Sequence, residues 1–412
     1  MTNPKKLETC RISDSNHLVN VLNLGEQVLT GVFPKSTEEV ITKGPLELVW
    51  CPDSGLLQLS CSYDLDEMYG DNYGYRSGLN QSMVRHLSEK VQRLEGAYGL
   101  SSGQLVVDIG SNDATSLKAY QTTGIQRIGI DPTAEKFREY YTDGIELVPD
   151  FFNKANFDQL AKGKKADLIT SISMFYDLEQ PLAFISDIRE SLAPEGVWHF
   201  EQSYMPSMLR TCSYDTVCHE HLEYYSLTVV DKMLRQNGLR VLDVEMNAVN
   251  GGSFAVTAAH ESSSWKSNAA IVDWMLDQED RMGLGSIRPY RDFEERVFRH
   301  RQDLMRLVRS LVADGKKVFG YGASTKGNVL LQFCGFTVDE IPCIAEVNEE
   351  KFGAFTPGTN IPIVSEEDAR EMEPDYFLVL PWHFRDGILQ REQEFRKRGG
   401  KFIFPLPEIE II

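Results

Sequence analysis

The chain reads LVVDIGSNDATSLKAYQTTGIQRIGID over residues 105–131. Two apolar runs of strand length, 105–110 and 127–131, flank a turn that contains Gly110 and a short helical segment. Apolar runs that alternate with helical segments are typical of a parallel sheet with helices packed on it. This stretch therefore predicts a strand–turn–helix–strand unit at the centre of an α/β domain.

The same alternation continues beyond this unit. Further apolar runs of strand length lie at 166–173, 196–202, 239–246 and 253–260, and the segment 182–192 between them is helical in pattern. The turn residues Asn250, Gly251 and Gly252 join the last two runs, which predicts a hairpin that ends the sheet. We expect a parallel sheet with helices on both faces.

The flanking segments predict two additional parts. Residues 1–80 are rich in turns and short apolar runs, which indicates a small irregular lobe before a domain at 81–261. Residues 262–315 are helical in pattern, with one apolar stripe that Gly315 ends. A second strand–helix alternation, with apolar runs at 317–322, 341–347, 376–382 and 401–407, predicts a smaller α/β domain within residues 262–412.

Composition narrows the class of protein. Of 412 residues, 42% are hydrophobic and 25% are charged, as in globular proteins. A net charge of −19 disfavours nucleic acid or an anionic membrane as partner. No apolar stretch has the length of a membrane helix, and the first residues lack the core of a secretory signal. We expect a cytoplasmic protein whose seven scattered cysteines are reduced thiols.

The glycine turn has the chemistry that S-adenosylmethionine requires. Gly110 lets the backbone pass close to a ligand, and Asp131, at the end of the second strand, can accept both ribose hydroxyls of adenosine. Asp108 beside the glycine suits a cationic ligand better than a pyrophosphate, and the turn lacks the G-x-G-x-x-G pattern of dinucleotide sites. The fold class expected is therefore a Rossmann-like sheet of the class I methyltransferase type. The alternative is an ordinary α/β turn whose acidic residues are incidental. We place Asn112 and Tyr75 with these cofactor-binding residues.

Residues 215–225 read DTVCHEHLEYY, with His219, Glu220 and His221 at the centre. A histidine can take a proton near neutral pH, and a neighbouring carboxylate can orient its ring. His-x-His is also a spacing of metal ligands, with Cys218 or Cys212 as further candidates, although no second ligand pair stands nearby. Buried histidines that only satisfy polar neighbours are the third possibility. We predict catalysis, and no metal.

A second glycine turn, GYGASTKG, follows the run at 317–322. Backbone N–H groups at the start of a helix attract phosphate, and Lys326 could add a positive charge. A tight turn whose glycines, including Gly322, serve packing alone explains the pattern equally well.

Together these motifs resemble the sugar C-methyltransferases of deoxysugar and antibiotic biosynthesis, over nearly the whole chain. The shared motifs are CRIS at 10–13, CPDSG at 51–55, YGYRSG at 73–78, DIGSND at 108–113, the His-Glu-His cluster, GGS at 251–253, GYGASTKG at 320–327 and PGTNIPI at 357–363.

The resemblance implies a zinc-binding N-terminal lobe, a central methyltransferase domain and a C-terminal α/β domain, with a nucleotide sugar between the last two. It implies that His221 is the base, with Glu220 beside it, and that an enolate formed next to a sugar ketone takes the methyl group. A related keto compound is an alternative substrate. The expected substrate-side residues are Cys218, Tyr224, Gly322, Lys326 and Asp177.

The chain departs from the family pattern at several positions. Ser13 and Ser54 replace the second cysteine of each zinc pair, and serine is a poor zinc ligand, so we expect no structural zinc. Cys218 replaces a tyrosine, Asp177 replaces a histidine, and Ala114 replaces a glycine at a helix start that should tolerate it. The other functions considered are O- or N-methylation, and a nucleotide-binding oxidoreductase or non-catalytic binding protein.

Overall fold

The computed structural model describes residues 4–64, 67–68 and 76–412. Its largest sheet has seven strands in the order β12-β13-β10-β9-β6-β7-β8. The strands are β6 (Leu105–Ile109), β7 (Gln126–Ile130), β8 (Ile145–Val148), β9 (Ala166–Ile172), β10 (Leu192–Ser203), β12 (Leu239–Asn247) and β13 (Ser253–His260). All neighbours pair in parallel except for the two pairs made by β13. The predicted parallel sheet with a terminal hairpin is confirmed.

Alternating side chains of the central strands pack on helices on both faces. From β6, Leu105, Val107 and Ile109 lie in one core with α4 (Lys154–Ala161), α5 (Pro181–Ser191), α7 (Leu227–Gln236) and α8 (Ala269–Met282). Val106 faces the opposite way, toward α2 (Gln81–Tyr98) and α3 (Thr115–Lys118). A strand that is buried on both faces is expected to be mainly apolar, and β6 is apolar except for Asp108 near its carboxyl end.

A second sheet of six strands forms the C-terminal part, in the order β16-β15-β14-β17-β18-β19. Its strands are β14 (Val318–Tyr321), β15 (Ile344–Glu346), β16 (Ile363–Ser365), β17 (Tyr376–Val379), β18 (Lys401–Phe404) and β19 (Glu410–Ile411). Its helices are α10 (Thr325–Cys334), α11 (Glu366–Glu371), α12 (Arg385–Arg391) and α13 (Gln393–Lys397). The predicted second α/β alternation is confirmed, and all pairs except β18–β19 are parallel.

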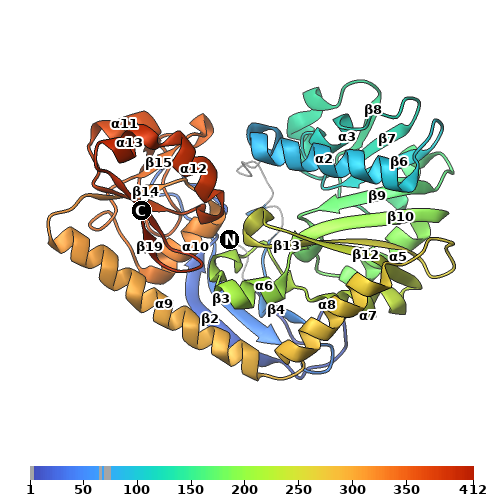
Figure 1. The fold of residues 1–412 in the computed structure, drawn as a ribbon, viewed down its shortest axis with the longest axis horizontal. Coiled ribbons are helices and arrows are strands. Elements are labelled where there is room, and N and C mark those ends of the chain that lie inside the picture. The colour runs from blue at the N-terminus through green and yellow to red at the C-terminus, as the bar shows by residue number, and fades with distance from the viewer. Residues whose placement is uncertain (1–3, 65–66, 69–75) are drawn as a thin grey trace.

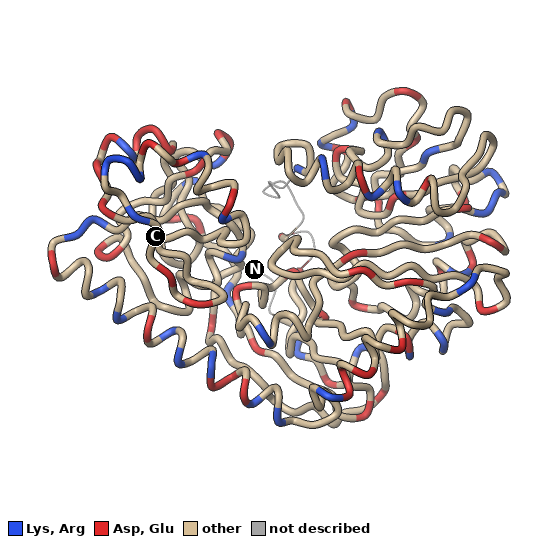
Figure 2. Tube along the Cα trace, viewed as in Figure 1, with Lys and Arg blue, Asp and Glu red and all other residues tan. Residues whose placement is uncertain are grey.

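The helix α9 (Arg288–Ala313) runs along the base of the molecule toward the second sheet (Figure 1). Its predicted stripe is buried at Phe293, Val297, Leu304 and Val308. Its outer face carries basic and acidic residues in alternation (Figure 2), including the exposed pairs Arg291–Glu294 and Arg306–Asp303. Exposed pairs of this kind contribute little to stability and keep the face solvated.

The N-terminal residues do not form the irregular lobe that the sequence predicted. Three strands, β2 (Val19–Val28), β3 (Lys43–Trp50) and β4 (Leu57–Leu59), form an antiparallel sheet with β11 (Glu223–Tyr224) at its edge. The expectation was wrong because β2 contains two register shifts against β3, which break the two-residue alternation of buried side chains. Two short strands, β1 (Lys5–Lys6) and β5 (Cys61–Ser62), pair beside it.

None of the helices in the described ranges is both long enough and apolar enough to cross a membrane.

Candidate active site

A cavity of about 320 Å³ opens at the carboxyl ends of β6, β7 and β9, where open α/β sheets bind ligands. Side chains from the central sheet, the His-Glu-His segment and the second glycine turn line it together. Of the predicted site residues, the cavity is lined by Asp108, Gly110, Asn112, Asp131, Asp177, Cys218, Glu220, His221 and Lys326. Residues that are far apart in the sequence therefore meet around one space.

The turn after β6 has an unusual backbone. Gly110 has φ +72°, and a Cβ atom there would lie 3.1 Å from Cγ of Met174. Asn112 has φ +48°, and its Oδ1 accepts the backbone N–H of Ser77 at 2.9 Å. Ala114 has φ +60°, so the expectation that this position tolerates alanine easily was wrong, because the left-handed conformation costs a non-glycine residue about 1–2 kcal/mol.

Asp131 holds the turn in place from the end of β7. Its Oδ2 accepts the N–H of Asn112 at 2.8 Å, and its Oδ1 accepts the N–H and hydroxyl of Thr133 at 2.6 and 2.7 Å. The side chain is almost completely buried, yet it lines the cavity. The carboxylate is thus held by three hydrogen bonds within the protein, at the edge of the cavity.

We expect Asp131→Asn to weaken the affinity for S-adenosylhomocysteine by about 10- to 100-fold, because hydrogen bonds to a charged acceptor contribute about 1.5–3 kcal/mol. Isothermal titration calorimetry measures this change. Asp150→Asn is the matched control, since Asp150 also follows a strand but is exposed and lies outside the cavity lining. If the two variants bind S-adenosylhomocysteine with equal affinity, Asp131 does not take part in ribose recognition.

The sequence did not predict the apolar wall of this pocket. Phe151, Phe152 and Pro132 line the cavity beside Asp131. The two phenylalanines follow β8, a strand of four residues that the sequence pattern did not reveal. Aromatic residues just after the third strand of the sheet would have been the signal.

His221 has a defined tautomer. Its Nδ1 lies 3.0 Å from the carbonyl oxygen of Thr216, so Nδ1–H donates and Nε2 keeps its lone pair. The ring lies against Tyr176, with 4.2 Å between ring centroids. Burial, together with the positive charge of Lys326, lowers the pKa of His221 to about 3. His221 is therefore neutral at physiological pH and can accept a proton at Nε2.

Burial also shifts the pKa values of the neighbours of His221 toward their uncharged forms. It raises the pKa of Glu220, and it raises the pKa of Cys218 well above the ordinary thiol value. Cys218 is accordingly a thiol and not a nucleophilic thiolate at neutral pH. Burial lowers the pKa of Lys326, an effect that Asp215 opposes.

The structure places the remaining predicted residues away from the cavity lining. His219 is fully buried, with Nδ1 3.4 Å from the Thr30 hydroxyl and its ring edge-on to Tyr63. Tyr224 is buried, and its hydroxyl lies 3.4 Å from the Thr216 carbonyl oxygen. Gly322 packs on Pro381. Tyr75 lies outside the described residues.

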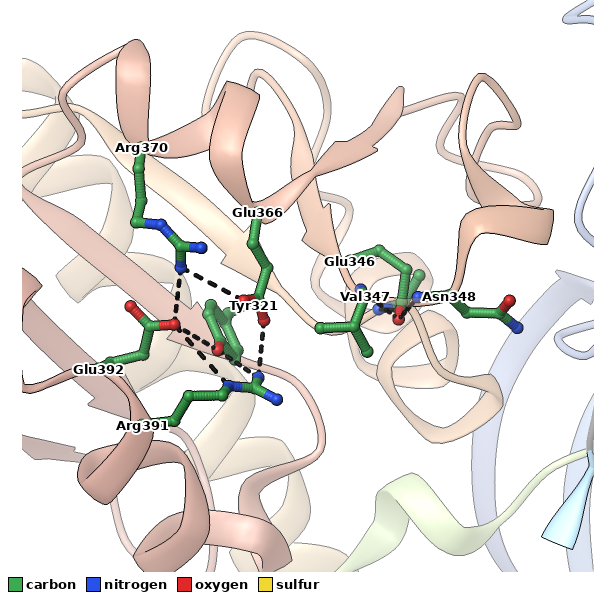
Figure 3. Close-up of polar contacts among 9 residues, drawn as sticks. Tyr321, Glu346, Val347, Asn348, Glu366, Arg370, Arg391 and Glu392 are labelled. Carbon is green, nitrogen blue, oxygen red and sulfur yellow. Dashed lines mark hydrogen bonds and ion pairs between the residues drawn. The ribbon is translucent and has the colours of Figure 1, made fainter. Parts of the chain in front are cut away.

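The second glycine turn is held by an acidic residue that the sequence did not predict. Glu346, at the end of β15, accepts the N–H groups of Ala323, Val347 and Asn348 at 2.7, 2.7 and 2.9 Å (Figure 3). Gly322 has φ +82°, and a Cβ atom there would lie 2.6 Å from Pro381, so glycine is needed for the turn itself. Lys326 nevertheless reaches the cavity, with Nζ 2.7 Å from the Asn250 carbonyl oxygen.

A separate network in Figure 3 fixes the outer helices of this part. Arg370 donates to Glu392 at 2.7 Å, and Arg391 donates to Glu366 at 2.6 Å. Tyr321 donates to Glu392 at 3.0 Å and so ties β14 to the same group. The acidic and basic side chains satisfy one another, which indicates a structural role.

Comparison with known proteins relates this geometry to a family. One relative, the C-methyltransferase NovU of Streptomyces niveus, is 32% identical over 411 residues, which cover 99% of this chain and 97% of that protein. The chain belongs to the C-methyltransferase family. The family model "C-methyltransferase C-terminal domain" matches residues 248–407 of this C-methyltransferase, "Methyltransferase domain" matches 79–244, and "Putative zinc binding domain" matches 10–69.

Solved structures similar to this C-methyltransferase include other methyltransferases. Magnesium protoporphyrin IX methyltransferase from Synechocystis PCC 6803 is 17% identical, with a TM-score of 0.33, over 47% of this chain and 91% of that chain. The N-methyltransferase NodS from Bradyrhizobium japonicum WM9 is 15% identical, with a TM-score of 0.32, over 44% of this chain and 98% of that chain.

This C-methyltransferase is an S-adenosylmethionine-dependent enzyme, and its residues fit that donor. The cradle at Gly110 would be filled by a Cβ atom, and Asp131 supplies two carboxylate oxygens to the same cavity. Asp108 lies beneath both, where its Oδ1 accepts the Thr170 hydroxyl at 2.6 Å. Gly110 and Asp108 would hold the methionine part of the donor, and Asp131 would hold the ribose.

The pH dependence of donor binding should report on Asp108. Burial, opposed by Thr170, raises the pKa of Asp108 to about 7. A cationic donor favours the ionised carboxylate, so its affinity should rise as the pH increases from about 6 to about 8. Calorimetry across this range measures the slope, and the Asp108→Asn variant should flatten it. An unchanged slope in that variant would assign the titration to another group.

In the N-terminal segment, each of the two cysteines lies next to the serine of the other motif. Cys10 Sγ lies 3.2 Å from Ser54 Oγ, and Cys51 Sγ lies 3.8 Å from Ser13 Oγ. Both cysteines are buried. Among the described residues, no group of three or more histidine, cysteine or acidic side chains is arranged to hold a metal ion.

Proposed function

We propose that this C-methyltransferase methylates a carbon next to the ketone of a nucleotide-linked keto-deoxysugar, with His221 as the base. The observation that supports the role of His221 most directly is its tautomer: the carbonyl of Thr216 takes Nδ1–H, and Nε2 is left as an acceptor on a residue that lines the cavity. The Gly110 turn and Asp131, to which we assign donor binding, line the same cavity. In this proposal, the base and the donor site share one cavity.

The proposed reaction has two steps. Nε2 of His221 takes the proton from the carbon next to the ketone, and the electrons of that C–H bond move into the ketone to form an enolate. When bound, S-adenosylmethionine would supply an electrophilic methyl group. The enolate carbon would form a bond to that methyl group as the methyl–sulfur bond breaks, and S-adenosylhomocysteine would be released. The cavity holds both partners close to the reacting geometry, which lowers the entropic part of the barrier.

The low pKa of His221 sets a requirement on the substrate. A base with a pKa of about 3 takes a proton from carbon only if the resulting imidazolium is stabilised. The developing enolate supplies that negative charge next to the ring. The ammonium group of Lys326, which lines the same cavity, stabilises the enolate in turn.

The second sheet supports a nucleotide-linked substrate. Thr325 and Lys326 begin α10, and both line the cavity opposite the donor turn. The start of a helix and a lysine together attract a phosphate group. We place the nucleotide on this side and the sugar ring between Lys326 and His221, near Cys218 and Asp177.

Hydrogen exchange tests this function without the methyl donor. Nucleotide 4-keto-sugars are incubated with the enzyme in D₂O, and NMR follows deuterium at the carbon next to the ketone. We expect exchange that depends on His221, followed by transfer of ¹³C-methyl from labelled donor to that same carbon. Methyl transfer to oxygen or nitrogen, with no exchange, would contradict the proposal.

A further inference from the structure

The segment that carries His221 contacts Tyr176, after β9, and also pairs with the N-terminal sheet. The strand β11, which begins two residues after His221, pairs antiparallel with β4, with Glu223 opposite Gln58. The N–H of Leu59 donates to the carbonyl oxygen of Leu222 at 2.9 Å. The short strand that follows His221 in the chain is therefore an edge strand of the N-terminal sheet.

A second N-terminal segment packs on the other side of the cluster. The Thr30 hydroxyl lies 3.4 Å from Nδ1 of His219. Gly31 lies directly against Glu220, since a Cβ atom at residue 31 would approach Oε1 to 2.1 Å. The cluster is thus enclosed between residues 30–31 and β4, and its position depends on the N-terminal sheet.

One buried ion pair joins β11 to Arg11, which is itself bound to β4 and β5. Nε of Arg11 lies 3.5 Å from Oε1 of Glu223, and the side chains are 1% and 0% exposed. The Arg11 guanidinium also donates to the Leu59 carbonyl and the Ser62 hydroxyl, both at 2.9 Å. Among the described residues, neither carboxylate oxygen of Glu223 accepts a hydrogen bond from a side chain, and the backbone N–H of Leu178 lies close to this carboxylate. Arg11 therefore supplies the principal positive charge beside this carboxylate, whose other charged neighbour, Glu179, is acidic.

We propose that Arg11 is a positioning residue for His221, acting through Glu223. Arg11 is fixed to β4 and β5 and does not line the cavity. A buried carboxylate that loses its cation must become protonated or move toward water. Either change shifts β11, and with it the imidazole two residues away. This inference rests on the proposed role of His221 as the base.

The test uses the full-length protein with Arg11→Met, which removes the charge and keeps most of the side-chain length. We expect turnover to fall by about 10- to 100-fold, as for small misplacements of a catalytic group, with S-adenosylhomocysteine affinity unchanged within about twofold. In ¹⁵N-histidine NMR, the Nδ1–H signal of His221, assigned with His221→Gln, should shift or be lost. Arg93→Met is the matched control, because its partner Glu245 is half-exposed and distant from the loop. It should leave all three measurements unchanged.

A second variant keeps the proposal testable if Arg11→Met unfolds. Arg11→Met combined with Glu223→Met removes both charges, a replacement that buried pairs often tolerate. We expect the double variant to regain turnover and the His221 signal relative to the single variant. Reduced melting temperature with normal turnover and a normal His221 signal would overturn the proposal. If His221→Ala keeps its turnover while Arg11→Met still moves the signal, the proposed base is wrong but the positioning role stands.

Discussion

Replacing His221 with alanine should abolish most turnover and leave donor binding intact. General base catalysis contributes about 10²–10⁴-fold to rate, so we expect a loss of that size in kcat. Donor affinity should stay within about twofold, because the residues to which we assign donor binding, Gly110 and Asp131, follow other strands, β6 and β7. Methyl transfer from labelled donor and calorimetry with S-adenosylhomocysteine measure the two quantities separately.

Two further measurements make the His221 result specific. His260→Gln is the matched control, since His260 ends β13 outside the cavity lining and should keep full activity. Because the pKa of His221 is lowered to about 3, the wild type should show no acid limb from this residue in kcat/KM between about pH 6 and pH 8. Turnover of the alanine variant at the wild-type rate would exclude His221 as the base.

The second large effect concerns metal binding. We expect the Ser13→Cys/Ser54→Cys double variant to bind about one zinc ion per chain, whereas the wild type binds none at structural affinity. In a tetrahedral site with Zn–S bonds of about 2.3 Å, neighbouring sulfurs lie about 3.8 Å apart. The Cys10–Ser54 and Cys51–Ser13 distances of 3.2 and 3.8 Å already approach that spacing.

The Cys51 thiol also ionises more readily than an ordinary thiol. Burial raises the pKa of Cys51, but hydrogen bonds involving Ser54 and Ser13 outweigh it, and the net pKa is lowered. Elemental analysis after gel filtration gives the zinc content, and the melting temperature should rise with zinc and fall on chelation. Each single variant, with three thiolates, should bind more weakly. A double variant that stays free of zinc would show that the two substitutions are not enough to restore a zinc site in these loops.

The sequence predicted those parts of the site that follow from local patterns. Gly110 and Asp131 were predictable because a glycine turn and a strand-end carboxylate have fixed positions in an α/β unit. His221 was predictable from its cluster and from the family resemblance. His219 contacts Tyr63, whereas His221 lines the cavity. The sequence could not show this difference, because the direction of a side chain in a loop depends on packing.

Features that depend on contacts between distant segments were not predictable. The pairing of β11 with β4 and the ion pair between Arg11 and Glu223 join segments that no local periodicity connects. Glu346 was missed for a related reason: β15 is three residues long, so the end of that strand could not be located from the sequence.

Asp131 and Glu346 occupy equivalent places in two different sheets. Each ends the second strand of its unit, and each accepts an N–H group from the turn that follows the first strand. The same type of contact therefore occurs in both sheets, and residues that follow both turns line one cavity. Because each turn is held in advance by its own acidic residue, we expect ligand binding at either turn to require little rearrangement of the backbone.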